Sequence, residues 1–333
     1  MFSRSRGTKH GTTAAHGGRI FLKGTGLSSP FRHSPPRMLY AIAFLVLITA
    51  GCGPTRCLNV AAFGNLGPQV NSPYDDYAPA LSDTAALVFT SNRIEPGEGG
   101  LQQFYQSVRP TRLFFTMRLD EDWDEAQIYR LLFNGNGPTA EAATISFAPA
   151  GSPFNTVAYV SSCTRSDSSA GCDLFAVVER QGAGLVNLGG EINSTSWDGH
   201  PFVTQDGKRL FFVSDRPGGF GGNDIWFSER LSSGAWGTPQ NMGSTVNTAG
   251  DELSPFYDDA THSFYYASTT SDTGLDIFIV ERGSSGPRRL PPPYNSEYDD
   301  FTPFLLNGRL YLASNRGGGC GGYDLYAFAY GTK

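Results

Sequence analysis

The chain has 333 residues, 41 of them glycine and 21 proline, with 13% aromatic and 17% charged residues, a balance typical of many turns between short aromatic strands. Residues 1–37 hold seven of the 25 basic side chains and no acid, and residues 38–51 hold no charge. The remainder therefore has 18 basic against 31 acidic residues, a net charge of −13. A surface this acidic repels phosphate backbones, which argues against a nucleic-acid partner.

The N-terminal region contains a short apolar run, MLYAIAFLVLITAG, at residues 38–51 between Arg37 and Cys52. Its length suits the apolar core of a signal peptide better than a membrane-spanning helix. Thr49–Cys52 resembles the lipobox of bacterial lipoproteins, although Thr49 stands where that family prefers Leu. The resemblance implies lipid attachment at Cys52, and the alternative is an ordinary secretory signal with an incidental cysteine.

We therefore expect residues 1–51 to be a basic leader and lipoprotein signal peptide that takes no part in the fold. Residues 52–57 would be the lipid-bearing linker, with two or more acyl chains making attachment stable. Met38 also fits a translation start, in which case residues 1–37 are untranslated. Gly53 is not Asp, which by the lipoprotein rule implies the outer membrane with the protein facing the periplasm.

An internal repeat runs through residues 58–333. Its first signal is an Asn followed eight residues later by Pro, with acids or aromatics between them. A short apolar strand follows, then a turn such as Asp206-Gly207 or Asn307-Gly308, which favours a hairpin. The four complete copies of the Asn and Pro signal are Asn71…Pro79, Asn193…Pro201, Asn247…Pro255 and Asn295…Pro303. A degenerate copy lies near Asn136.

Each repeat continues with a second strand that ends on Ser, a polar or Gly-rich loop, and a third strand that opens with Asp. The second strands are 87–91, 157–161, 210–214, 264–268 and 310–314, and the third strands are 173–180, 224–230, 276–282 and 324–330. In the first repeat Gln103 replaces the Asp, and residues 110–135 are interpreted as an insertion. Fourth strands are expected at 185–190 and 238–243.

Four-stranded antiparallel units repeated in this way predict an all-β fold, a β-propeller. The last unit lacks a fourth strand, and residues 58–67 have the fourth-strand pattern, so the N-terminal strand should complete the last blade and close the ring. This predicts five blades. Six blades are the alternative if residues 110–135 contain a degenerate one, and a two-sheet sandwich would leave the register of the repeat unexplained.

The repeat at residues 206–230, DGKRLFFVSDRPGGFGGNDIWFSER, resembles the TolB-type, WD40-like propeller repeat, and residues 310–328 match it nearly as well. Residues 87–93 match in part, and the resemblance spans about residues 58–330. It implies the propeller fold strongly and function weakly, because propellers host many functions.

The acids between each fourth strand and the next first strand are the main candidate site. We expect them to gather at one mouth of the central channel and to bind a ligand or partner, or Ca²⁺ through oxygen atoms. The competing interpretation is that they only form turns. The candidate residues are Asp75, Asp76, Asp198, His200, Asp251, Glu252, Asp299 and Asp300.

Other features have structural interpretations. The Asp residues that open the third strands (Asp173, Asp224, Asp276 and Asp324) should fix loops. The Gly-rich loops at 217–222 and 317–322 precede strands rather than helices, which disfavours a phosphate site. Cys163 and Cys172 flank one hairpin loop and are predicted to form a disulfide in an exported protein. Cys57 and Cys320 are expected at opposite faces, and the sequence leaves open whether they pair.

The sequence contains no recognisable catalytic motif and no required cofactor, so we predict a monomeric, lipid-anchored binding module rather than an enzyme. By resemblance to TolB, its partners would be envelope proteins or a peptidoglycan-associated protein. The alternative is a carbohydrate-active propeller, either a glycosidase or a sugar binder, that uses channel carboxylates. The short linker predicts that the acidic face points away from the membrane.

Overall fold

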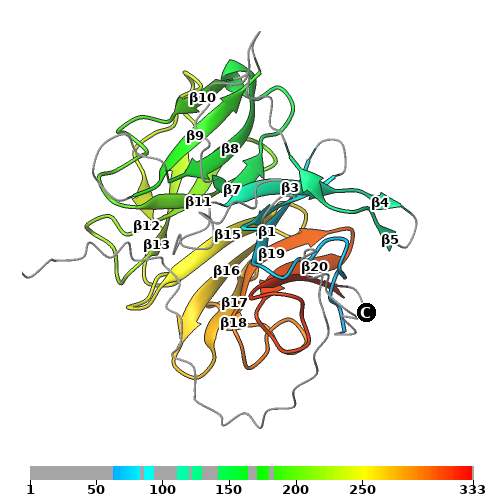
Figure 1. Ribbon diagram of the computed structural model, residues 1–333. Coiled ribbons are helices and arrows are strands. Elements are labelled where there is room, and N and C mark those ends of the chain that lie inside the picture. Colours follow the sequence, from blue (N-terminus) through cyan, green and yellow to red (C-terminus); the bar gives the residue numbers. More distant parts are fainter. Residues whose placement is uncertain are drawn as a thin grey trace, which may run out of the picture. The chain divides into compact units, whose positions relative to one another are not determined.

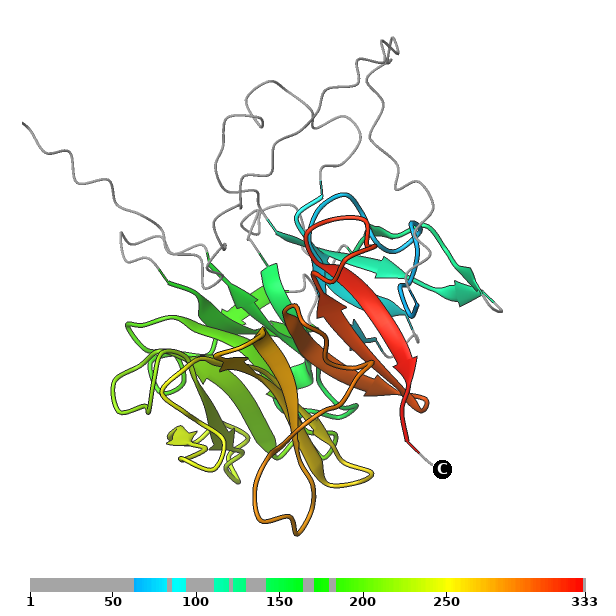
Figure 2. The same cartoon turned by 90° about the horizontal axis from the view of Figure 1, so that it is seen from below.

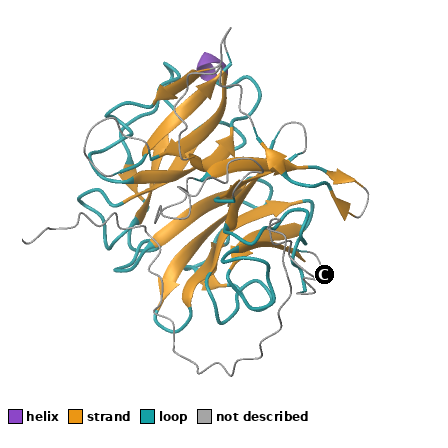
Figure 3. Cartoon of the chain, viewed as in Figure 1, coloured by secondary structure: helices purple, strands orange, loops and turns teal. Residues whose placement is uncertain are grey.

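The computed structural model describes residues 63–82, 86–93, 111–119, 122–129, 142–163, 171–179 and 184–331. In this part of the chain almost all regular structure is β-strand, and the one helix is a three-residue 3-10 turn, Pro153–Asn155 (Figure 3). No helix among these residues has the length and apolar character needed to cross a membrane.

The strands form five antiparallel sheets, each made from a continuous stretch of chain (Figure 1). Blade 1 contains β1 (Asp76–Leu81), β2 (Leu87–Ser91), β3 (Arg112–Thr116) and β6 (Gln127–Ile128). Blade 2 contains β7 (Ala142–Phe147), β8 (Thr156–Ser162), β9 (Asp173–Val178) and β10 (Gly184–Asn187). Strands β4 (Arg118–Leu119) and β5 (Asp122–Trp123) form a small separate hairpin beside blade 1.

The remaining three blades follow the same order. Blade 3 contains β11 (Asp198–Val203), β12 (Arg209–Ser214), β13 (Asp224–Glu229) and β14 (Gln240–Asn241). Blade 4 contains β15 (Glu252–Asp258), β16 (Ser263–Thr270), β17 (Gly274–Val280) and β18 (Arg288–Arg289). Blade 5 contains β19 (Asp300–Leu306), β20 (Arg309–Ser314) and β21 (Asp324–Ala329).

The first strands of the blades, β1, β7, β11, β15 and β19, contact one another in a ring and converge at the centre of Figure 1. Each pairs with one strand only, so its other edge faces the channel. This explains why Pro79, Pro201, Pro255 and Pro303 are tolerated inside strands, since a missing N–H costs little at an unpaired edge. The predicted five-bladed, all-β propeller is therefore confirmed, and the six-bladed and sandwich alternatives are excluded.

Each of these four prolines follows a residue in the left-handed region, with φ between 47° and 55°. The pairing register slips at this point in β1, β11, β15 and β19, which identifies a bulge. Residues before proline and residues with a Cβ both disfavour this backbone conformation, at a cost of about 1–3 kcal/mol each. The four residues are Ala78, His200, Ser254 and Thr302.

The repeated Asn ties each blade to the one before it. Asn247, at the start of blade 4, accepts the backbone N–H of Ile225 in β13 and donates its amide to the Ile225 carbonyl, both at 2.9 Å. Asn193 and Asn295 make the same pair of bonds to Leu174 and Ile277. The Asn in the sequence motif therefore joins neighbouring blades.

The ring closes through the N-terminal segment, as predicted. Asn65 bridges Tyr326 of β21, the N–H of Leu66 donates to Leu325, and the N–H of Ala327 donates to Gly64. Figure 2 shows this blue segment beside the red final strand. Residues 58–62 of the predicted closing strand lie outside the described residues.

Large apolar side chains pack between the blades. Tyr159 and Leu174 of blade 2 belong to one cluster with Leu210, Phe212 and Trp226 of blade 3, and all five are at most 8% exposed. Burying each such side chain contributes about 1.5–3 kcal/mol. Neither blade could bury these faces alone, which is why the repeats must stack.

Two predictions about strand boundaries were wrong. The third strand of blade 1 is β3 at Arg112–Thr116, which pairs with β2, rather than the run that begins at Gln103. The interval interpreted as an insertion therefore supplies the third and fourth strands. The inner strands also begin three residues before the Pro, at Asp76, Asp198 and Asp300, because the bulge lets the strand continue through the proline.

Candidate functional site

Three of the predicted binding acids are buried ion-pair partners. Asp198 is 0% exposed and accepts from Arg216 at 2.6 Å, while its other oxygen accepts from the backbone and hydroxyl of Ser194. The guanidinium of Arg216 also lies over the rings of Phe212 and Trp226. Asp76 with Arg93 and Asp300 with Arg316 repeat this arrangement. These carboxylates connect the start of an inner strand to the loop after the second strand.

The neighbouring acids bridge to the preceding blade. Asp251 accepts the backbone and side-chain N–H groups of Asn223, and Asp75 accepts the N–H of Tyr323. Asp299 accepts from the N–H of Leu275 and from Asn315. These bonds confirm that the connections between blades and the loops after the second strands share one face of the ring, which we call the acid face.

Glu252 takes the place of the buried Asp in blade 4, which has no Arg in its loop. Its carboxylate accepts from the backbone and hydroxyl of Thr248 and from the hydroxyl of Ser268. Burial raises the pKa of Glu252 above its usual value. All seven predicted acids therefore have partners within the protein, and their predicted role in ligand binding stays a prediction.

The acids of the third strands and the Gly-rich loops form one structural unit. Asp224 accepts the N–H of Phe220, and Asp324 accepts the N–H of Cys320 and Gly321. A Cβ on Gly219 would lie 2.1 Å from an oxygen of Asp224, so only glycine allows this approach. The amides that could have held a phosphate instead bind the protein's own carboxylates.

A cavity of about 870 Å³ occupies the channel and opens towards the hairpin turns, at the end opposite the acid face. All five inner strands line it, from the bulge onwards, together with the β7–β8 turn. None of the seven predicted acids is among its described lining residues, which include His200. The structure therefore separates His200 from the carboxylates with which the sequence grouped it.

His200 lies within the bulge of β11 and is 6% exposed. Its Nδ1 accepts the backbone N–H of Ser254 from the next blade at 3.2 Å, so Nε2 carries the ring hydrogen. The ring of Trp197 packs against it at 5.4 Å and 86°. Burial lowers the pKa of His200 to about 4, so the imidazole is neutral at pH 7.

Two hydroxyls in the cavity make bonds of the same kind. Thr302 Oγ1 accepts the N–H of Ala78 at 3.3 Å, and Ser146 Oγ accepts the N–H of Val203 at 3.0 Å. Each bond joins neighbouring blades at the channel. The sequence analysis did not identify Thr302 or Ser146 as site residues. Thr302 could have been found, because it directly precedes the repeated Pro, as His200 does.

The described lining contains two carboxylates, Glu179 and Asp258. Asp258 accepts from the backbone N–H groups of Ala260 and Thr261 and from the Thr261 hydroxyl, which fixes the β15–β16 turn. Glu179 is thus the carboxylate of this lining with no such turn-forming role. Among the described residues no group of three His, Cys, Asp or Glu side chains could hold a metal ion.

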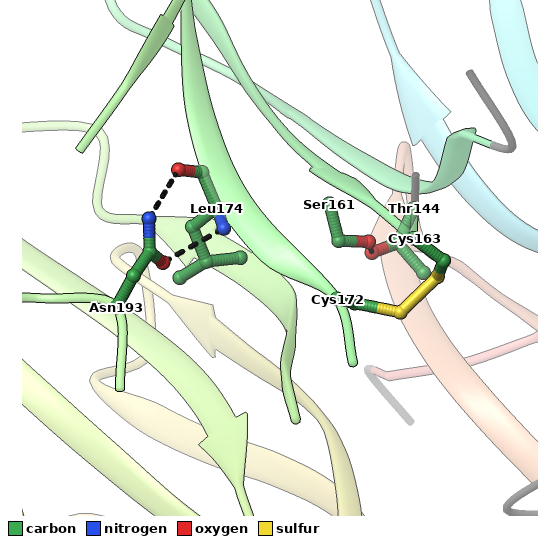
Figure 4. The surroundings of a disulfide bond; sticks show 6 residues. All are labelled: Thr144, Ser161, Cys163, Cys172, Leu174 and Asn193. Carbon is green, nitrogen blue, oxygen red and sulfur yellow. Dashed lines mark hydrogen bonds between the residues drawn. A yellow bond between two sulfur atoms is a disulfide. The ribbon is translucent and has the colours of Figure 1, made fainter. Parts of the chain in front are cut away.

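The predicted Cys163–Cys172 disulfide is present, with an S–S distance of 2.00 Å (Figure 4). The figure also shows Thr144 and Ser161 beside it, and Asn193 bound to Leu174. Cys320 is disulfide-bonded as well. The sequence left the pairing of Cys320 open, and the structure shows that this cysteine is oxidised.

Comparisons with known proteins find distantly similar solved structures but no family for this chain. No protein-family model and no curated protein matches the chain. Among solved structures it is similar to TolB of Agrobacterium tumefaciens (14% identity, TM-score 0.44, 73% of this chain and 71% of that one). TolB of Acinetobacter baumannii is similar at 12% identity and TM-score 0.42, covering 80% of this chain but only 57% of that one.

An endo-arabinase of Bacteroides thetaiotaomicron is equally similar, with 12% identity, a TM-score of 0.45, and coverage of 81% of this chain and 98% of that one. At these identities neither similarity decides function.

Proposed function

We propose that the chain is a lipid-anchored envelope protein whose propeller binds a ligand or partner without chemical turnover. The proposal rests on one observation, namely where the acidic side chains lie and which partners they bind. Asp76, Asp198 and Asp300 are held in buried ion pairs. The described cavity lining is mostly apolar or neutral, and its only carboxylates are Glu179 and Asp258. Pockets with apolar walls and a few placed polar groups are typical binding sites.

Export is supported by the cysteines and by the N-terminal sequence. Disulfides persist in oxidising compartments, and both Cys163–Cys172 and Cys320 are oxidised here. The apolar run before Cys52 fits a lipoprotein signal. We infer that Cys52 carries the lipid and that the protein faces the periplasm from the outer membrane.

Labelling with a radioactive fatty acid tests the anchor. The wild-type chain should take up label and sediment with outer membranes, and Cys52→Ala should do neither. Capture of cross-linked proteins from solubilised membranes, with the unanchored variant as the control, tests for an envelope partner. Label retained in Cys52→Ala would refute the anchor, irrespective of what the propeller binds.

The glycosidase alternative needs two carboxylates on either side of the scissile bond, about 5–9.5 Å apart. Asp258 is engaged in its turn, which leaves Glu179 without a suitable second acid in the described lining. We therefore expect no hydrolysis of aryl arabinosides, xylosides or mannosides. Turnover that Glu179→Gln abolishes would establish the enzyme instead.

A further inference from the structure

The cavity at the turn face combines aromatic walls with a neutral polar floor. Four rings that are half-buried line it: Tyr129, Phe147, Phe202 and Phe304. Phe202 and Phe304 both pack against Phe256, at 5.1 and 5.3 Å between ring centres, so the wall formed by blades 3 to 5 is continuous. Tyr129 and Phe147 make a second wall, at 6.2 Å from each other.

The floor groups share one hydrogen-bonding pattern. His200, Thr302 and Ser146 each accept a backbone N–H from the adjacent blade, through Nδ1 or a hydroxyl oxygen. An acceptor bond of this kind leaves the hydrogen on Nε2 or on the hydroxyl free to donate. No hydrogen bond from His200 Nε2 is present among the described residues. The floor therefore offers donors around the axis.

The charges of the cavity lining restrict the class of ligand. His200 is neutral at pH 7, and the described lining has no Lys or Arg side chain; its charged groups are the carboxylates of Glu179 and Asp258. An anionic ligand would lose its hydration without gaining a positive counter-charge, which is costly. The ligand should therefore carry no negative charge, and it should have oxygen atoms that accept hydrogen bonds from the floor and an apolar face that packs on aromatic rings.

We propose that this cavity binds a neutral saccharide of two or three sugar units. Sugar rings present C–H faces that pack on aromatic side chains and hydroxyl oxygens that accept from the floor. The cavity volume of about 870 Å³ is within the range of small-molecule sites. The inference rests on the proposed binding function and places the ligand on the face opposite the acids.

His200→Asn is the decisive variant. The Asn side-chain oxygen can replace Nδ1 as the acceptor for Ser254, and Asn tolerates the φ of 47° at this position, but the Nε2 donor is lost. The matched control is Phe220→Ala, which truncates a side chain 51% exposed in a loop of the acid face, outside the cavity lining.

Calorimetric titration of the full-length chain with maltotriose, cellotriose and xylotriose tests the proposal. We expect at least one to bind the wild type and Phe220→Ala equally, and His200→Asn about tenfold more weakly, the loss of one hydrogen bond. The Nε2–H resonance of wild-type His200 should shift during the titration, which gives a readout independent of the variant's stability.

The saccharide proposal would be overturned by the absence of binding by all three sugars, by equal binding by His200→Asn, or by equal or tighter binding of a charged digalacturonate. Binding of an uncharged Phe-containing tripeptide in place of the sugars would also refute the saccharide class while leaving the general binding function intact. Fatty-acid labelling at Cys52 is unaffected by any of these outcomes.

Discussion

Asn71 holds Leu325, 254 residues further along the chain, with the same two hydrogen bonds that join consecutive blades elsewhere. Its Oδ1 accepts the Leu325 N–H at 2.8 Å, and its Nδ2 donates to the Leu325 carbonyl at 3.0 Å. The ring thus closes by repeating its ordinary blade-to-blade contact. The Asn of the first repeat, Asn71, therefore binds the last blade.

Asn71→Ala should destabilise the protein by about 2–4 kcal/mol, because two backbone groups of Leu325 would be left buried without partners. The matched variant Asn247→Ala removes the same bonds to Ile225, 22 residues away. Urea unfolding of both variants measures the cost. Limited proteolysis should release the final blade only from Asn71→Ala. Equal protection of that blade in both variants would contradict a special role for Asn71 in closure.

The buried ion pairs should matter far more than the exposed ones. Asp198→Asn leaves Arg216 without its anion and should cost about 3–5 kcal/mol. Glu229 and Arg209 form a comparable pair at 3.0 Å in which both side chains are about half exposed, so Glu229→Gln should cost less than 1 kcal/mol. Thermal denaturation compares the two, and similar melting temperatures would show that Asp198 is replaceable.

Among the described residues of blade 2 there is no ion pair of this kind, and a disulfide lies at the start of the corresponding loop. Ala142 begins its inner strand where the other blades have an acid, and Cys163 follows Ser162 where the loops of blades 1 and 3 continue towards Arg93 and Arg216. We infer that the Cys163–Cys172 bond replaces the ion pair in fixing the loop. The double variant Cys163→Ser, Cys172→Ser should lose about 2–3 kcal/mol. An unchanged urea midpoint in the double variant would show that the disulfide does not take over the stabilising role of the ion pair.

The buried imidazole of His200 predicts an acid-dependent loss of stability. Its pKa is about 4 in the folded protein and near 6.5 when unfolded, so below pH 6.5 the unfolded chain takes up a proton that the native state does not. The free energy of unfolding should therefore fall between pH 6.5 and 4, by an amount of the order of 3 kcal/mol. The difference between wild type and His200→Asn across this interval isolates the effect, and a constant difference would contradict it.

The sequence predicted the blades because the repeat is carried by local signals: an Asn, a Pro, a hairpin turn and a strand ending on Ser. It failed where a local signal was absent, as at Gln103, where no Asp marked the third strand. It also grouped His200 with the acids because they are neighbours in sequence. The bulge before Pro201 places His200 in the cavity instead, and a left-handed residue within a strand cannot be inferred from strand periodicity.

Cysteine pairing provides a final test that also bears on the membrane anchor. The chain has five cysteines, of which Cys163 and Cys172 bind each other and Cys320 is oxidised. The sequence therefore offers Cys52 and Cys57 as candidate partners for Cys320. A cysteine that carries a thioether lipid cannot form a disulfide. We therefore predict a Cys57–Cys320 bond, which would join the start of the propeller to the loop preceding the last strand. Non-reducing peptide mapping by mass spectrometry distinguishes a Cys57–Cys320 bond from a Cys52–Cys320 bond. A peptide linking Cys52 to Cys320 would rule out lipidation at Cys52. A Cys57–Cys320 peptide together with an acylated Cys52 peptide would support the anchor, and it would show that the ring is closed covalently as well as by Asn71.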